Sequence, residues 1–539
     1  MSSSLYHSSI VWGRQVWDRP AVLAATLLGL SIIYIFYQAI CGPKLPKLPV
    51  VGAKPGEWFP FQRAKWRNAQ SMKVATETAY NEYRDTACIL PIMGGQTLVH
   101  LPYNEFQWLV DQPDSDLDNL AQLMDAFLFD YTIMDPKLTH FPIHIGLLTG
   151  QLTREIGNLV PDLMLEIQHA VDNIWPMDTE NYSTICAYDM MLRVTGQAIN
   201  HTFIGRPLCR NPAVLDAATA FSLDVPIAAT LLHFFPPILR PFVAPIITLP
   251  NRIHTYRFYR LVRPEVRRRL KDYDARRADP NGKEASEPEP KDLLQWSIKQ
   301  AKLSPDPYHR KVDTLAGRVM LNNFNSIHAS SFAATHAILD LAAGKQEYID
   351  ELYDEITSVL VAHGGEWSKR ALAAMPKLDS TMRESQRLNS LIVTATNRMV
   401  ANPKGVTTPS GVHLPHGTMV CAPSYPVMHD PIIYPEPETF KPFRFAEKRN
   451  DLANGGSSYL QRARQALTTT SPEFPAFGHG RHACAGRFFA SSMLRLILAY
   501  VVLHYDFEMQ EQRAENVWFG SNRIPPLKAT IRVKRKTAI

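Results

Sequence analysis

The sequence is poor in cysteine and carries no large excess of either charge. Its six cysteines are scattered, with no Cys-x-x-Cys pair and no density of the kind that marks a disulfide framework. The net charge is +6, from 57 basic and 51 acidic residues that are interspersed along the chain. These absences exclude a small disulfide-stapled domain and give no reason to expect a nucleic-acid partner. We expect the bulk of the chain to be cytosolic.

The chain also lacks internal repeats and Gly/Ser-rich linkers. Its 539 residues are 45% hydrophobic, which is ordinary for a globular protein with a large core. Length alone suggests three or four domains, but no break in composition divides the chain, so one large domain is compatible with it. From about Gln62 to Leu391 apolar positions recur at helical spacing, and strand-like alternation is short. This pattern predicts a mainly helical fold.

One long uncharged run stands near the N-terminus. Residues 21–41 read AVLAATLLGLSIIYIFYQAIC, close to the ~20 residues that a helix needs to cross a bilayer. The run exceeds the ~7 to 15 residue core of a signal peptide and lacks a small-residue cleavage site before Pro43. We therefore predict a transmembrane anchor at 21–41 in preference to a cleaved signal. A short lumenal segment, 1–20, precedes it, and a proline-rich hinge, 42–55, follows.

The strongest chemical signal is the segment from Phe477 to Ala490, FGHGRHACAGRFFA. It places Cys484 at the end of a glycine-rich loop and at the start of an apolar helix. Glycines let a backbone approach a flat cofactor closely, and a helix N-terminus favours a thiolate. A thiolate ligand pushes electron density onto haem iron. The ordinary alternative for a lone cysteine is a buried side chain beside a turn.

This segment resembles the haem-binding loop of the cytochrome P450 superfamily, Phe-x-x-Gly-x-x-x-Cys-x-Gly. Phe477, Gly480, Cys484 and Gly486 fall in register with that pattern. The resemblance implies heme b with Cys484 as the axial iron ligand. His482 stands where the family often has a basic residue at a haem propionate. The cofactor-binding residues that the resemblance implies are Cys484, Phe477, Gly478, His482, Gly486 and Arg398.

Two further motifs resemble the same superfamily. Glu384-Ser-Gln-Arg387 matches its Glu-x-x-Arg motif, and the segment Phe-Lys-Pro-Phe-Arg-Phe, which contains Arg444, matches its Phe-x-Pro-x-Arg-Phe segment. The resemblance implies that Glu384, Arg387 and Arg444 form a buried network that supports the haem loop. Arg398 follows at the interval of a propionate-binding arginine. Taken alone, the Glu-x-x-Arg pattern is a common surface pair, and Arg398 could equally belong to a surface ion pair.

The resemblance covers essentially the whole chain, and its motifs are similar to those of the fungal branch that modifies terpenoids and related secondary metabolites. It implies a mainly α cytochrome P450 fold, with a helix-rich haem domain and a small β-rich part, whose catalytic domain is 56–539. It also implies a single-pass protein on the cytosolic face of the endoplasmic reticulum membrane. The implied reaction hydroxylates, epoxidises or successively oxidises an apolar small molecule, using O2 and electrons from NADPH. The implied partners are NADPH-cytochrome P450 reductase and, as a further candidate, cytochrome b5.

Residues 325–330 depart from the family's oxygen-binding pattern, Ala/Gly-Gly-x-Asp/Glu-Thr-Thr. His328 replaces the acid and Ala329 replaces the first threonine. We therefore predict that His328 and Ser330 are catalytic: Ser330 or Ser326, with His328 and ordered water, would supply protons. The alternative is that His328 only satisfies a neighbouring helix.

Two rival functions remain open at this point. A haem-thiolate isomerase or dehydratase would use a peroxide or epoxide substrate and need no reductase. A membrane-anchored binding protein would keep the fold without haem chemistry. Dependence on NADPH and reductase separates the monooxygenase from the first rival, and haem in the purified protein separates it from the second. Arg481 and Arg487 beside the loop are candidate contacts for an acidic reductase surface.

Overall fold

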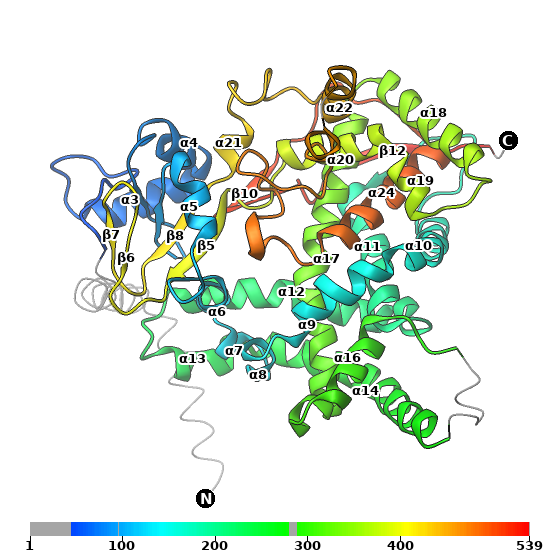
Figure 1. The fold of residues 1–539 in the computed structure, drawn as a ribbon, viewed down its shortest axis with the longest axis horizontal. Helices are drawn as coiled ribbons and strands as arrows, with labels where there is room; N and C mark the ends of the chain where they lie inside the picture. Colours follow the sequence, from blue (N-terminus) through cyan, green and yellow to red (C-terminus); the bar gives the residue numbers. More distant parts are fainter. Residues whose placement is uncertain (1–44, 95, 280–287, 457, 538–539) are drawn as a thin grey trace, which may run out of the picture.

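The computed structural model describes residues 45–94, 96–279, 288–456 and 458–537. The predicted anchor at 21–41 and the predicted lumenal segment 1–20 lie outside these residues. The described chain is a helical body with a smaller part, rich in strands, that gathers around β5, β6, β7 and β8 at one side (Figure 1). This arrangement confirms the predicted mainly α fold with a small β-rich part.

A long buried helix, α17 (Val312–Ala342), runs through the helical body (Figure 1). It packs against α11, α12, α14, α20 and α24. Apolar residues occur on all its sides, as expected for a helix with neighbours all round. The other helices of eight or more described residues are α3 (Pro60–Gln70), α4 (Met72–Asn81), α6 (Asn119–Phe127), α10 (Thr153–Ile174), α11 (Ala187–Ile204), α12 (Pro212–His233), α13 (Arg240–Ile247), α14 (Leu249–Ala278), α16 (Leu293–Leu303), α18 (Gln346–Ala362), α20 (Pro376–Leu388), α22 (Arg444–Asn454) and α24 (Arg487–His504).

The described strands form one five-stranded sheet and three smaller ones. In the larger sheet the order is β1-β2-β8-β5-β3, with β2 and β8 parallel and the other neighbours antiparallel. A bulge between Ala395 and Arg398 interrupts the pairing of β5 with β8. The strands are β1 (Cys88–Leu90), β2 (Leu98–His100), β3 (Leu117–Asp118), β4 (Ser183–Cys186), β5 (Thr394–Val400), β6 (Val406–Thr407), β7 (His413–Leu414), β8 (Met419–Pro423), β9 (Tyr505–Phe507), β10 (Val517–Phe519), β11 (Asn522–Ile524) and β12 (Thr530–Arg535).

The C-terminal part of the predicted hinge is already attached to the body. The backbone N–H of Val51 donates to the carbonyl of Ile89 at 2.9 Å, and the N–H of Ile89 donates to the carbonyl of Pro49 at 2.8 Å. Val51 is buried against the apolar face of the larger sheet. Any free spacer between the predicted anchor and the body therefore ends before Pro49.

Two described helices, α12 and α24, are long and apolar enough to cross a membrane by length and composition. Most of α24 is buried inside the helical body, where it packs against α10, α17, α18 and α20. Its apolar character is therefore explained by the core. Helix α12 is about half covered by α14, α17 and neighbouring segments.

Candidate active site

A cavity of about 930 Å³ lies between α17 and the glycine-rich loop of residues 475–486. One wall is the face of α17 that carries Asn322, Ala329 and Ser330. The opposite wall is the loop, including Phe477, with its cysteine. We call this space the central cavity. Because the predicted oxygen-binding residues and the predicted ligand loop face each other across it, it is the candidate active site.

The loop holds its shape through glycines with positive φ and through short backbone hydrogen bonds. Gly478 and Gly480 have φ angles of 69° and 74°, values that L side chains rarely adopt. The N–H of Cys484 donates to the carbonyl of Phe477 at 2.7 Å. A Cβ on Gly480 would lie 2.2 Å from Cγ1 of Val110, so this glycine also allows a close approach. The loop ends directly before α24, as the sequence predicts.

The thiol of Cys484 lies deep within the protein but is accessible, because the surface that it exposes faces the central cavity. Burial raises the pKa of this thiol, whereas the backbone N–H groups of Gly486 and Arg487 act to lower it. The net direction is upward, so the N-terminus of α24 does not by itself produce the thiolate that the sequence argument expected. A stable thiolate here needs a positive partner in the cavity, which a bound metal centre supplies.

The loop also leaves room for a flat group. A Cβ built on Gly486 would meet no heavy atom within 4 Å, although this residue lines the cavity two positions after the cysteine. Phe477 and Gly478 line the same wall. An accessible thiol with open space beside its loop matches what a haem ligated by cysteine requires.

Two basic residues line the cavity near the loop. Arg398 on β5 is 3% exposed, and Nη1 donates to the carbonyl of Asn397 at 2.9 Å. Burial lowers its pKa to about 10, so it is a cation at neutral pH, and it forms no ion pair with any acid in the described part of the chain. His482 Nε2 lies 2.7 Å from Oδ1 of Asp114. A buried cation without an anion, facing the cavity, fits a group that carries carboxylates.

The structure places Ser330 at the central cavity and turns His328 away from it. Ala329 and Ser326 also line the cavity. His328 Nε2 lies 3.2 Å from the carbonyl oxygen of Thr219, and Nδ1 lies 2.9 Å from the hydroxyl of Tyr188. Because a carbonyl only accepts, Nε2 carries the proton and Nδ1 accepts from the tyrosine. Both ring nitrogens are thus used outside the cavity, and burial lowers the pKa of this ring.

This geometry corrects the expected role of His328. It matches the alternative in which His328 satisfies neighbouring helices, here α11 through Tyr188 and α12 through Thr219. The physical reason is the rotation of the side chain about α17: successive residues differ by about 100°, so a position next to a cavity-lining residue can face the core.

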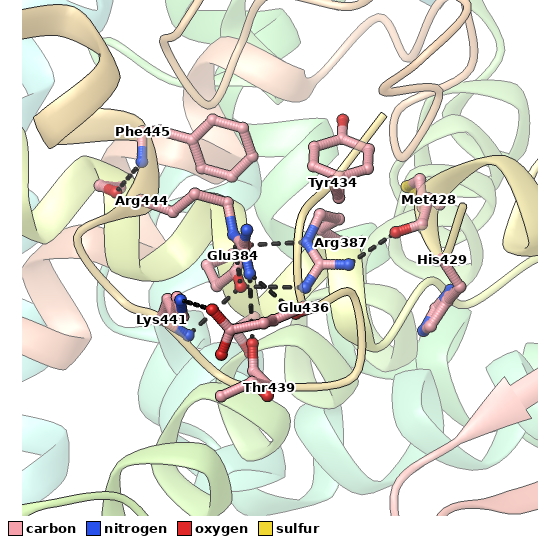
Figure 2. Close-up of polar contacts among 12 residues, drawn as sticks. Glu384, Arg387, Met428, His429, Tyr434, Glu436, Thr439, Lys441, Arg444 and Phe445 are labelled. Atoms are coloured by element: carbon pink, nitrogen blue, oxygen red, sulfur yellow. Dashed lines mark hydrogen bonds and ion pairs between the residues drawn. The ribbon is translucent and has the colours of Figure 1, made fainter. Parts of the chain in front are cut away.

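Glu384, Arg387 and Arg444 come together in a buried ion-pair network (Figure 2). Arg387 donates from Nε and Nη2 to the two oxygens of Glu384 at 2.8 and 2.9 Å, and Nη1 donates to the carbonyl of Met428 at 2.6 Å. Arg444 Nε donates to Glu384 Oε1 at 3.0 Å. Bidentate pairing of this kind is among the stronger charge-assisted arrangements.

The network reaches the cysteine loop through a residue that sequence reasoning missed. The guanidinium of Arg387 lies over the ring of Tyr434, 5.0 Å from its centroid, and the hydroxyl of Tyr434 donates to the carbonyl of Glu473 at 3.0 Å. Glu473 stands two residues before the loop. Asp114, the partner of His482, was missed as well. Neither residue carries a local signal, because each meets its partner only after the chain has folded.

A second polar network behind the cavity was also missed. Asp340 on α17 accepts from Ser385 Oγ at 2.6 Å and from Asn389 Nδ2 at 2.9 Å, and it pairs with Arg513. Arg513 Nη2 in turn donates to Nδ1 of His336 at 2.8 Å, and His336 lines the cavity. These contacts fix α17 against α20 and the C-terminal segment.

Comparisons with known proteins agree with this geometry. The sequence model of the family described as Cytochrome P450 matches residues 146–529. Cytochrome P450 monooxygenase gloP of Glarea lozoyensis is 31% identical over 493 residues, which cover 89% of this chain and 89% of the relative. Cytochrome P450 monooxygenase tenB of Beauveria bassiana is 30% identical over 526 residues, 95% of this chain and 96% of the relative. A solved structure, retinoic acid bound cyanobacterial CYP120A1, has the same fold, with a TM-score of 0.63, 16% identity and coverage of 91% of this chain and 100% of that one.

Proposed function

The chain belongs to the cytochrome P450 family of haem-thiolate monooxygenases, and we propose that Cys484 is the axial ligand of its haem iron. The observation that carries this proposal is the accessible Cys484 thiol, which faces the central cavity with the N–H groups of Gly486 and Arg487 beside it. A haem bound in this way activates dioxygen so that one oxygen atom enters the substrate. Phe477, Gly478 and Gly486 would form the wall against the ring.

Arg398 and His482 are the proposed contacts for the haem propionates. Arg398 is a buried cation at the cavity with no acid paired to it in the described residues, and it can donate to a carboxylate from several N–H groups. His482 lies on the loop itself and already contacts Asp114 at 2.7 Å. By holding the propionates at the edge of the haem, Arg398 and His482 would together fix its orientation.

Ser330 is the proposed proton donor on α17, with Ser326 as the neighbouring candidate. Both hydroxyls line the cavity, whereas Ala329 presents only a methyl group there. A serine hydroxyl can pass a proton from ordered water to oxygen in the cavity. The ring nitrogens of His328 instead contact the hydroxyl of Tyr188 and the carbonyl of Thr219, so we propose that His328 positions α17.

Electrons would come from NADPH through NADPH-cytochrome P450 reductase, with cytochrome b5 as a further candidate donor. Arg481 is half exposed beside the loop, where it donates to the carbonyl of Gln112 and lies 3.7 Å from the carboxylate of Asp114, and its exposed part can meet an acidic partner surface. Arg487 donates from Nη1 to the carbonyl of Cys484 at 3.1 Å and from Nε to the carbonyl of Thr468 at 3.3 Å. Arg487 therefore stabilises the loop, and Arg481 is the better candidate contact.

The proposed substrate is an apolar small molecule of the terpenoid type. Support comes from the cavity wall, where Leu123, Phe127, Leu148 and Phe332 present apolar surface. The similar proteins gloP, tenB and htyF are monooxygenases of fungi, which fits the resemblance of the motifs to the fungal branch. Hydroxylation, epoxidation and successive oxidation are all compatible with this wall.

We also propose a single-pass location on the cytosolic face of the endoplasmic reticulum. The uncharged run at 21–41 supports an anchor. Large apolar side chains on and beside α13 add support, since Ile238, Phe242 and Ile246 are 73%, 75% and 78% exposed. Arg252 and Arg257 follow on α14, a combination that suits an anionic membrane surface.

Reconstitution with the reductase tests the function. The purified full chain, the reductase and NADPH are incubated with a terpenoid panel under oxygen, and products are identified by mass. Oxygenated products that require both reductase and NADPH, with one oxygen atom from O2, are expected. Product formed equally well without NADPH would instead favour the isomerase or dehydratase, the rival to which Ala329 lends weight.

A further inference from the structure

Buried nitrogen atoms without hydrogen-bond partners among the described residues lie beside the central cavity, behind the part of its wall that His144 and Asn322 form. Arg318 on α17 is 1% exposed, and its Nη2 lies 2.7 Å from Nδ1 of His309. Its Nε and Nη1 have no hydrogen-bond partner among the described residues. We call Arg318, His144 and His309 the Arg318 cluster. Unpartnered donors at this depth are costly, so they call for an acceptor.

The cluster adjoins the cavity from the side away from the cysteine loop. Arg318 lies one helical turn before Asn322 on the same face of α17, and Asn322 lines the cavity. His144 on α9 (Ile143–Gly146) lines the cavity too; it is 5% exposed, and its Nδ1 has no partner in the described chain. At ~1.5 Å per residue, Arg318 is about 16 Å along the helix axis from Ala329.

The cluster carries an uncompensated positive charge. Burial lowers the pKa of Arg318 to about 10, so the guanidinium stays protonated at neutral pH. Burial and the charge of Arg318 lower the pKa of His144 to about 4, so that ring is neutral. Asp135 is the acid that acts on Arg318, but its carboxylate accepts from the hydroxyl of Tyr308 at 2.8 Å and forms no ion pair with the arginine.

Another buried arginine shows how this chain otherwise compensates such a charge. Arg269 on α14 is 3% exposed and pairs with Asp292 at 2.6 Å and with Glu265 at 2.6 Å, and its Nη2 donates to the carbonyl of Ile204. Arg318 has the same burial without these partners. A buried cation left without an ion-pair partner one turn behind a cavity wall favours an anion at that wall.

We propose that the Arg318 cluster receives an anionic group of the substrate, so that the substrate class is an apolar molecule with a terminal carboxylate. This inference rests on the proposed function, because it places the apolar body between the cluster and the Cys484 end. His144 and Asn322 contact the carboxylate at the cavity wall, and the guanidinium of Arg318 supplies the charge from one turn behind. Hydrogen bonds from His144 and Asn322 give the direction of binding, and the electrostatic attraction of the buried guanidinium, which is not screened by water, adds to its strength.

Binding of matched acid and alcohol probes tests the proposal. Isothermal titration calorimetry on the full-length holoenzyme compares dodecanoate with 1-dodecanol, and abietate with abietyl alcohol. In at least one pair the acid is expected to bind ten-fold or more tightly than the alcohol. Arg318→Met is expected to remove that preference while leaving the affinity for the alcohol unchanged. Equal affinities within both pairs, or no binding by either acid, would overturn the proposal.

Thermal stability gives a second readout that needs no ligand. If the cluster serves an external anion, Arg318→Met removes an uncompensated charge, and the thermal midpoint of the holoenzyme stays level or rises. The matched control, Arg269→Met, breaks a paired buried arginine and is expected to lower the midpoint. A drop for Arg318→Met as large as the control's would show that ordered water completes the cluster, and would count against the proposal. The haem spectrum of both variants shows separately whether haem is bound through the thiolate. Failure of the proposed function can therefore be distinguished from failure of the carboxylate site.

Discussion

Gly480 combines two constraints that a side chain could not meet. Its φ of 74° disfavours any L side chain, and an added Cβ would lie 2.2 Å from Cγ1 of Val110 on α5 (Phe106–Asp111). The loop that carries Cys484 therefore depends on this glycine for its path across α5. Gly478 shares the positive φ, but an added Cβ there would meet its nearest atom only at 3.7 Å.

Gly480→Ala is accordingly expected to destabilise the holoenzyme more than a substitution that changes φ strain alone. The matched control is Gly411→Ala, where φ is 85° and nothing lies within 4 Å. We expect a loss of about 1 kcal/mol for the control and about 2 to 4 kcal/mol for Gly480→Ala, because overpacking adds to the strain. Thermal midpoints and haem content measure both. Equal losses of stability in the two variants would show that the Val110 side chain moves aside for the added methyl group, and would contradict this expectation.

At the residue scale, the sequence was informative where function lies in a contiguous motif. The Cys484 loop, its glycines and the Glu384–Arg387 pair at i and i+3 are local patterns, and the structure brings them together as expected. His328 was different because its direction is set by α11 and α12, which approach from distant parts of the chain. Neighbouring residues on a helix point in different directions, so a shift of one position turns a side chain from the cavity to the core. Aligning a motif does not show which way each side chain points.

Among the elements, α17 is the helix whose residues we expect to take part in oxygen activation. Ala329 faces the cavity with a methyl group where a hydroxyl could donate a hydrogen bond to oxygen. Ala329→Thr is expected to raise the amount of product formed per NADPH consumed by several-fold, because proton delivery improves. The control is Ala333→Thr, one turn further along the same wall. Unchanged coupling in Ala329→Thr would show that Ser330 or Ser326 already suffices.

The larger sheet contains a buried histidine, His100, from which we expect a loss of stability in acid. His100 on β2 is 1% exposed and lies between Cys88 on β1 and Cys421 on β8, and its two ring nitrogens have no hydrogen-bond partner among the described residues. Burial lowers its pKa to about 4. Between pH ~6.5 and ~4 the unfolded chain therefore binds a proton that the folded chain excludes, so stability falls as the pH falls.

His100→Phe is expected to remove this dependence, which amounts to about 3 kcal/mol across the interval. The thermal midpoint of the variant, relative to the wild type, should rise steadily as the buffer is taken from neutral pH towards pH ~4.5. His413→Phe, at an exposed position on β7, serves as the control. A difference between variant and wild type that does not change with pH would contradict the account of His100.

The elements themselves were predictable to different degrees. Helix α17 and the helix after Cys484 stand out because their apolar positions continue for many turns. The attachment of Pro49 and Val51 to β1 was not predictable, since the prolines favour an extended backbone whether or not it pairs with a strand. Strand pairing such as that of β2 with the distant β8 likewise depends on contacts that local composition does not encode.

At the scale of the whole molecule, two segments that match the glycosylation pattern Asn-x-Ser/Thr, Asn181-Tyr-Ser and Asn200-His-Thr, test the proposed topology. Asn200 is fully buried, and its Nδ2 donates to the carbonyl of Gly196 and to Oδ1 of Asn323, so the folded chain cannot present it. Asn181 is exposed. If the body faces the cytosol, Asn181 stays unmodified in microsomes even though it is accessible.

We therefore expect no change in gel mobility when the full chain from microsomes is treated with a glycosidase or carries Asn181→Gln. The control replaces residues 1–44 by a cleaved signal peptide, which delivers the body to the lumen and should lead to modification at Asn181. A glycosidase-sensitive shift in the full chain, lost in Asn181→Gln, would place the body in the lumen and contradict the proposed location.

The most direct test of the central claim is the difference spectrum of the reduced protein with and without carbon monoxide. We predict a red-shifted Soret band for the wild type and for Cys186→Ser, a control at a partly exposed cysteine whose Sγ donates to the carbonyl of Leu527. The band should be lost in Cys484→Ser, because a hydroxyl cannot replace the thiolate. Persistence of the band in Cys484→Ser, or no haem signal in the wild type, would contradict the assignment of Cys484 as the haem ligand.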